Sequence, residues 1–361
     1  MIGVVLSWLG QRGPILLVVS LCCGLIAPAL AELSREWLSL SAFLLTLGSF
    51  LTAGFAPSES IRSRLIVMTL VWVGIALPFA AAVALRTVAI DPALRTGVLL
   101  SLLAPPVGSA AAIASMIGLQ PRLALLASLT LTIASPVSMP LLAYVLDLDI
   151  GFNGLALASR LLLIVGGAAV LSLAAVKWRG QIGALLPDQQ AAAGVAVIGL
   201  MIVGLAAAGR VHAHWAQNPM QLAKMLGVAT AVNFGLCALS ALVFLGLGVR
   251  LAATIGLISG NRNVTLAWAA ASAALPQLGE AYVAACVIPV LTLPLILRAV
   301  LKGRRIVEKG RWSRPDDDRG CVQRILVGVA TRHAAVRGSR ALAKVDPTAT
   351  PPRSIPCERN T

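Results

Sequence analysis

The sequence predicts an all-α polytopic membrane protein with ten transmembrane helices, built as two inverted five-helix repeats whose helices 4 and 9 are discontinuous and cross. Three observations lead to this prediction. Of the 361 residues, 58% are hydrophobic and 12% are charged, a composition far from that of a soluble globular domain. The apolar residues form long blocks without an amphipathic period. Two of these blocks are interrupted, at positions that correspond if the chain holds two copies of one five-span unit.

Each apolar block is long enough to cross a bilayer, which takes about 20 residues as a helix. In chain order the expected spans are Pro14–Leu30, Trp37–Phe55, Leu65–Leu85, Gly97–Leu119, Leu123–Leu146, Leu155–Val176, Ala191–Ala208, Leu222–Leu247, Leu251–Leu275 and Ala281–Leu301. The membrane part is therefore expected within residues 1–302, with repeat 1 at about 14–146 and repeat 2 at about 155–301.

The first span has a second interpretation. It follows Arg12 and ends in Ala29–Leu30–Ala31, as a signal peptide with a small-residue cleavage site does. We favour a transmembrane helix because the repeat requires a first span.

Charge in the short loops predicts the orientation. Arg and Lys are more frequent in the loops on the side of both termini, so the positive-inside rule places both termini in the cytoplasm, in a cell inner membrane. Nearly half of the 29 basic residues lie in residues 303–361. This segment is expected to be a disordered basic tail close to anionic lipid headgroups. We expect the lipid bilayer as its partner and no nucleic acid; the sequence predicts no oligomeric state.

Both interrupted spans carry features that are costly inside a membrane. In the fourth span, Pro105 and Pro106 remove backbone donors and precede Gly108. In the ninth, Gly260 is followed by Asn261–Arg262–Asn263, and a central arginine costs about 2.5–3.5 kcal/mol on insertion scales. Taken alone, the fourth span also fits a proline kink without function. Interrupted helices at corresponding positions of two halves instead indicate a transport site at the bilayer midplane.

Five is odd, so two five-span copies in sequence have opposite orientations in the membrane. Half-helix ends expose unpaired N–H and C=O groups, which attract anions and cations respectively. Arg262 then has two interpretations: a bidentate partner for an anionic cargo, or a side chain that only pairs with backbone carbonyls of the broken fourth helix. Asn261, Asn263 and Thr265 either face the cargo or satisfy backbone groups, and for Asn263 we favour the structural role.

At these residues the chain resembles the bile acid:sodium symporter superfamily. The resembling motifs are Ala104–Ser109 (APPVGS), Ser135–Pro140 (SPVSMP) and Gly260–Ala267 (GNRNVTLA), and the resemblance extends over roughly Pro14 to Leu301. It implies a panel domain, a core domain with the crossing helices 4 and 9, and transport by alternating access. It also implies substrate or ion contacts at Ser109 and at the fifth-helix hydroxyls Thr130, Thr132 and Ser135.

Sodium-coupled relatives hold sodium with a Glu and a Gln around the ninth-helix glycine, and this chain departs from both. The Glu position is Ile258 and the Gln position is Arg262, and no Asp or Glu is expected deep in any span. A positive charge about 4 Å from a cation repels it by about 4 kcal/mol at an effective dielectric of 20. Sodium is therefore a doubtful cofactor, and the guanidinium is expected to replace it.

Other chemistry is not indicated. The sequence has no P-loop, no nucleophile–base constellation and no Cys/His cluster, so we expect neither an enzyme nor a metal site. His212 and His214 are expected in a solvated loop. The expected function is a secondary transporter that moves a small organic anion, with weak or no sodium dependence. The alternatives are a sodium-coupled symporter with a rebuilt ion site, and a membrane-embedded sensor or scaffold that binds its ligand without moving it.

Overall fold

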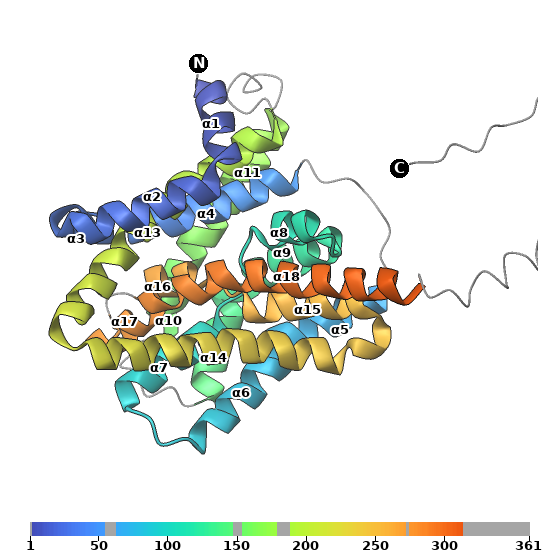
Figure 1. Ribbon diagram of the computed structural model, residues 1–361. Coiled ribbons are helices and arrows are strands. Elements are labelled where there is room, and N and C mark those ends of the chain that lie inside the picture. Colours follow the sequence, from blue (N-terminus) through green and yellow to red (C-terminus); the bar gives the residue numbers. More distant parts are fainter. Residues whose placement is uncertain (1, 55–62, 147–153, 179–187, 272–273, 313–361) are drawn as a thin grey trace, which may run out of the picture. The chain divides into compact units, whose positions relative to one another are not determined.

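The computed structural model describes residues 2–54, 63–146, 154–178, 188–271 and 274–312. The chain forms two units, residues 1–299 and 300–361, and the packing given below is that of the first. Almost all of the described residues are helical, and no strand longer than one isolated bridge occurs among them. Figure 1 shows the helices in chain order.

The helices of the first half are α1 (Ile2–Gln11), α2 (Gly13–Ile26), α3 (Pro28–Glu36), α4 (Leu38–Ala53), α5 (Ser63–Val71), η1 (Trp72–Ala76), α6 (Leu77–Arg86), α7 (Pro92–Leu103), α8 (Ala110–Ile117) and α9 (Pro121–Val145). Those of the second half are α10 (Gly154–Leu161), η2 (Leu162–Gly166), α11 (Gly167–Lys177), α13 (Gln189–Gln217), α14 (Pro219–Val243), η3 (Leu245–Leu247), α15 (Val249–Gly260), α16 (Val264–Ala271), α17 (Gln277–Ala285) and α18 (Val287–Trp312). Several begin with proline at the first position, where a missing N–H costs nothing.

Six helices in the described part of the chain are long and apolar enough to cross a membrane, or up to eight if each of two bent pairs is one span. They indicate a helical multi-pass membrane protein, as predicted. Pro92–Leu103 and Val249–Gly260 are shorter apolar helices. These two are the first halves of the spans that the sequence predicts to be interrupted. The count of ten spans and the inverted repeat stay predictions.

Several helix boundaries differ from those expected, and three of the differences matter for the predictions. Residues 2–11 form α1, ahead of the first predicted span. Helix α13 continues to Gln217, so His212 and His214 lie in a helix and the loop predicted for them is wrong. Helix α18 continues to Trp312, past the boundary predicted at residues 302 and 303. The predictions for residues 313–361 lie outside the described residues.

Helix α13 packs along α1, α2, α3 and α4 through small residues that let the backbones come close. A Cβ at Gly48 of α4 would lie 2.5 Å from the Ala196 nitrogen, and one at Gly199 would lie 2.5 Å from the Ser41 carbonyl oxygen. The Ser41 hydroxyl donates to the Gly199 carbonyl at 2.7 Å. Small interfacial residues and hydroxyl hydrogen bonds are what hold helices together in a membrane.

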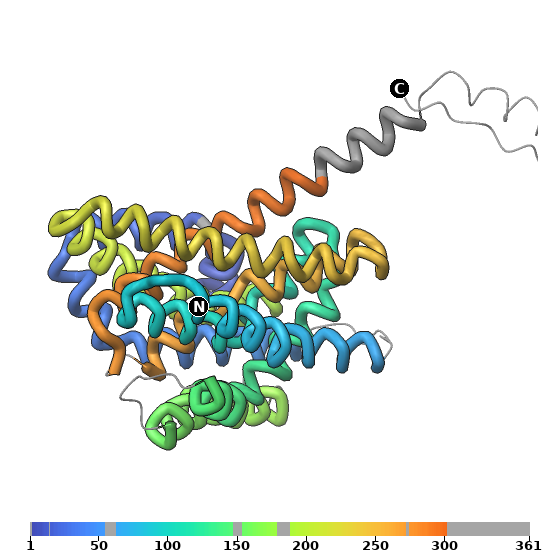
Figure 2. The backbone as a smooth tube through the Cα atoms, turned by 90° about the horizontal axis from the view of Figure 1, so that it is seen from below, coloured from blue at the N-terminus to red at the C-terminus, as the bar shows by residue number. Residues whose placement is uncertain are grey.

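A second set of helices packs around α17. Helix α17 contacts α7, α14 and α16, and α14 runs beside α15 in both views (Figures 1 and 2). The two sets meet where α13 contacts α17 and α14, and where α4 contacts α16. The largest fully buried side chains in the second set include Trp268 and Tyr282.

Candidate functional site

The two predicted interruptions lie against each other. Helix α7 ends at Leu103 and α8 begins at Ala110, while α15 ends at Gly260 and α16 begins at Val264. The two unwound segments form an antiparallel bridge between Pro106 and Arg262. In this bridge the Val107 N–H donates to the Asn261 carbonyl at 2.9 Å, and the Asn263 N–H donates to the Pro105 carbonyl at 2.7 Å. Backbone groups freed by one break are thus satisfied by the other, as an apolar interior requires.

Arg262 lies at the centre of this crossing and is 3% exposed. Its Nε donates to the Ser259 carbonyl at 2.8 Å, and its Nη1 donates to the Ala104 carbonyl at 3.1 Å. Both carbonyls belong to the carboxyl ends of half-helices, α15 and α7, where the helix dipole is negative. The guanidinium therefore contacts backbone carbonyls of both broken helices through two of its nitrogens, and its Nη2 takes no part in these contacts.

Four side-chain atoms at the crossing are buried and have no hydrogen-bond partner among the described residues. They are Arg262 Nη2, Asn261 Nδ2, Asn261 Oδ1 and Ser259 Oγ. A buried polar group without a partner costs about 1–3 kcal/mol, and several together are best explained by a ligand, an ion or water. The crossing thus offers a charged donor, two further donors and two acceptor oxygens for a small polar ligand.

The neighbouring polar residues of the ninth span are also buried. The Asn263 Oδ1 accepts a hydrogen bond from the Leu266 N–H at 3.2 Å and so caps the start of α16. This contact is the structural role favoured for Asn263. Thr265, in the first turn of α16, is 7% exposed.

The hydroxyls expected from the fifth and fourth helices do not all join this group. Thr132 and Ser135 are buried on α9, and the Ser135 hydroxyl donates to the Thr132 carbonyl at 2.7 Å. Thr130 and Ser109 are exposed. No group of three or more His, Cys, Asp or Glu side chains that could hold a metal occurs in the described part of the chain.

The helix-break residues have different roles. Pro105 and Pro106 are buried and end α7. A Cβ at Gly108 would collide with the Ser49 side chain of α4. A Cβ at Gly260 would collide with the Asn233 carbonyl oxygen of α14 and would lie 2.9 Å from the Cys237 Cβ. Gly260 is therefore needed for the close packing of α15 on α14, and it ends the helix without a positive φ.

One charged group was not foreseen. Glu280, in the first turn of α17 and at the edge of an expected span, is 3% exposed. The prediction that no carboxylate lies deep in a span stays a prediction. Its Oε1 and Oε2 accept from Nε and Nη2 of Arg35, both at 2.8 Å. Arg210 Nη2 lies 3.1 Å from Oε2, and the Trp268 indole donates to Oε1 at 3.2 Å. All three charged residues stand near the ends of expected spans, but they are brought together from distant segments of the chain.

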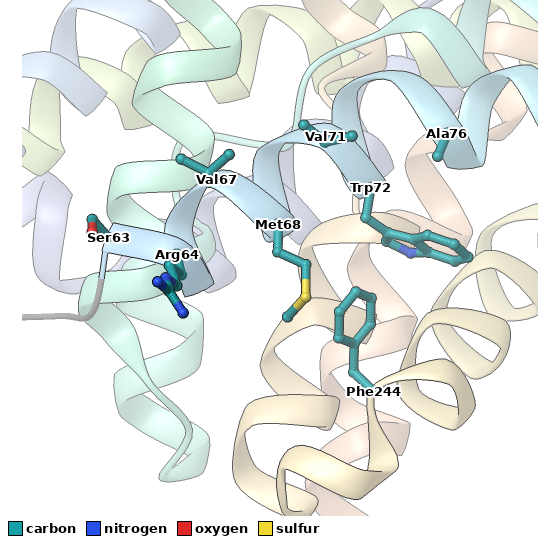
Figure 3. A pocket seen from close by; sticks show the side chains of 8 residues that line it. All are labelled: Ser63, Arg64, Val67, Met68, Val71, Trp72, Ala76 and Phe244. Atoms are coloured by element: carbon teal, nitrogen blue, oxygen red, sulfur yellow. The ribbon is translucent and has the colours of Figure 1, made fainter.

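A cavity of about 520 Å³ lies elsewhere, between the start of the third span and Phe244 (Figure 3). Arg64 and Ser63 lie at one end of it, and Trp72 and Phe244 lie at the other. The Trp72 indole donates to the Ser240 hydroxyl at 2.9 Å and its ring meets Phe244 edge to face. Trp72 thus packs one helix against another, and none of the crossing residues lines this cavity.

Comparison with known protein families assigns no family and no function to this chain. No protein-family model matches the chain, and no curated protein matches it.

Proposed function

We propose that this protein is a secondary transporter that moves a small organic anion across a cell inner membrane by alternating access. Its ten spans form two inverted five-helix repeats, both termini are cytoplasmic, and the cargo binds where helices 4 and 9 cross. The observation that carries the proposal is the pairing of the two unwound segments around a buried, incompletely paired arginine. In many secondary transporters, paired interrupted helices of this kind form the binding site near the middle of the membrane.

The sign of the cargo follows from the charge at the crossing. Arg262 is buried and the carboxylates in the described residues form their ion pairs with other arginines. The two carbonyls that Arg262 contacts carry only partial negative charge. A cargo carboxylate, sulfonate or phosphate would supply the missing full charge and accept from Nη2. Asn261 and Ser259 would add neutral contacts that orient it.

The same charge argues against sodium coupling. A sodium ion at the crossing would be repelled by the guanidinium of Arg262. Two of the hydroxyls expected to bind an ion, those of Thr130 and Ser109, are exposed and do not lie among the buried groups of the crossing. We therefore propose weak or no sodium dependence. A sodium-coupled mechanism would need an ion site built from other residues.

Purified protein in detergent and in proteoliposomes tests this proposal. We expect one class of small organic anion to raise the apparent stability, by about 2.7 kcal/mol at 100 times its dissociation constant. The same anion should show saturable uptake into proteoliposomes at equal rates in sodium and in choline buffer. Uptake that rises steeply with sodium would contradict the electrostatic argument. Stabilisation without any uptake would favour a sensor or scaffold over a transporter.

A further inference from the structure

A second group of buried charges lies apart from the crossing. The Glu280 cluster consists of Glu280, Arg35, Arg210 and Trp268. Both carboxylate oxygens of Glu280 face guanidinium groups, Arg35 in a bidentate pair and Arg210 through Nη2. The Nε of Arg210 is buried and has no partner in the described part of the chain. One carboxylate thus neutralises part of two positive charges, each of which comes from a different helix.

The cluster joins the two sets of helices described above. Arg35 and Arg210 belong to α3 and α13, which pack on each other, whereas Glu280 and Trp268 belong to α17 and α16. Every ionic contact of Glu280 therefore runs from one set to the other. Arg35 has a second carboxylate partner, Glu32, at 3.1 Å, but this pair lies within α3 and its Glu32 side chain is 70% exposed. The Glu32 pair cannot hold the two sets together.

One short helix connects the cluster with the crossing. Helix α16 begins at Val264, directly after Asn263, and carries the fully buried Trp268 that donates to Glu280. From Asn263 to Trp268 the helix rises by about 8 Å. A displacement of α17 and its carboxylate would therefore act on the residues around Arg262 through about one and a half turns of helix.

The exposure of the charges fits an interaction that can open. Glu280 is in the first turn of α17, and the Arg35 and Arg210 side chains are 35% and 19% exposed. Water can therefore reach all three groups if the helix sets separate at this end. A buried ion pair is costly to break while its partners stay dry, and that cost falls when both partners become hydrated. Such a contact is stable when closed and still reversible.

We propose that the Glu280 cluster is a latch that holds α3 and α13 against α16 and α17 and closes this end of the path to the crossing. The proposal rests on the transport function inferred above. It assigns Glu280 a positioning role: the carboxylate controls access to the cargo site and does not touch the cargo. The structure is then the form in which the latch is closed, in agreement with the burial of Asn261 and Arg262.

Cysteine accessibility tests the latch without any knowledge of the cargo. Ala207 is 1% exposed, lies three positions before Arg210 on α13, and belongs to the apolar cluster that also contains Tyr282 and Ala284 of α17. We would place Ala207→Cys in a full-length chain whose six native cysteines are replaced by alanine or serine. A membrane-impermeant maleimide is then applied to sealed vesicles of each orientation, and the labelling rate is measured.

Glu280→Gln should raise labelling of this reporter by about tenfold, and only from the side of the α13–α14 turn. The matched control is Glu32→Gln, which removes a carboxylate from the same arginine without crossing between the sets and should leave the rate unchanged. Arg210→Gln is a second test in case Glu280→Gln fails to fold. It keeps the bidentate pair between Arg35 and Glu280, so Glu280 stays neutralised and the fold should be retained. This variant should raise labelling by about threefold.

The latch would be overturned if Arg210→Gln were labelled at the same rate as the Ala207→Cys protein without it. It would also be overturned if Glu32→Gln raised the labelling rate as much as Glu280→Gln does. The labelling and uptake results are separable. If labelling rises but no anion is transported, the latch exists and the transport proposal fails. If an anion is transported while labelling stays unchanged in both cluster variants, the latch alone fails.

Discussion

Replacement of Arg262 by glutamine is expected to lower anion uptake by about 100-fold, the effect of removing one partner of a buried charge pair. Glutamine removes the positive charge and the unpaired Nη2, so the cargo loses its main partner. It also leaves the Ala104 carbonyl without its donor, which should lower the free energy of unfolding by about 1–3 kcal/mol. Uptake into proteoliposomes and thermal unfolding in detergent measure the two effects separately.

Arg262→Lys separates the role of the charge from that of the hydrogen bonds, and Arg64→Gln serves as a control. Arg262→Lys keeps the charge but loses the planar fork that can contact two carbonyls and the cargo at once, so uptake should be partly retained at a raised half-saturation concentration. Arg64→Gln, at an exposed arginine that lines the separate cavity, should transport like the parent. If Arg262→Gln is less stable but transports normally, the arginine only holds the crossing together.

Gly260→Val should be among the most destabilising single substitutions in the membrane part. The new side chain would meet the Asn233 carbonyl oxygen, the Cys237 Cβ and, at 3.0 Å, the Leu293 Cδ2. Backbone atoms of α14 cannot move aside alone, so α15 must move away from α14, at a cost of about 3 kcal/mol or more. Unfolding of the purified protein by heat or denaturing detergent gives this change directly.

Gly235→Val is the matched control, since it makes the same chemical change on α14, where a Cβ meets nothing within 4 Å. It should unfold within about 0.5 kcal/mol of the parent. Equal stability of the two valine variants would show that α15 and α14 are not held in the close contact described above. In that case glycine at position 260 would have to be explained by the helix end alone.

The sequence predicted the crossing better than it predicted the charges around it. Adjacent prolines at 105 and 106 and the polar run from Asn261 to Asn263 are local signals, because each conflicts with a continuous apolar helix. Their correspondence in the two halves was enough to predict that the breaks belong together. The helix breaks lie where expected and pair with each other.

Glu280 could not be found in this way. It stands at the end of an apolar block beside a turn-like segment, where hydropathy alone favours a solvated side chain. Its burial depends on Arg35, which is 245 positions away, and on how α3 and α13 pack against α17. The helical state of His212 and His214 was missed for a related reason, since α13 extends beyond its apolar block. Local composition carries no information on such partners.

The bridge between the unwound segments also limits how the protein can move. Its two backbone hydrogen bonds, between Val107 and Asn261 and between Asn263 and Pro105, lie among mostly buried residues. Separation of the segments would leave four backbone groups unpaired, at about 1–3 kcal/mol each. The four half-helices α7, α8, α15 and α16 are therefore expected to shift as one rigid body. If the proposed transport cycle changes which side of the membrane reaches Arg262, the change is expected to come from sliding or tilting of that body against α4, which packs on α16.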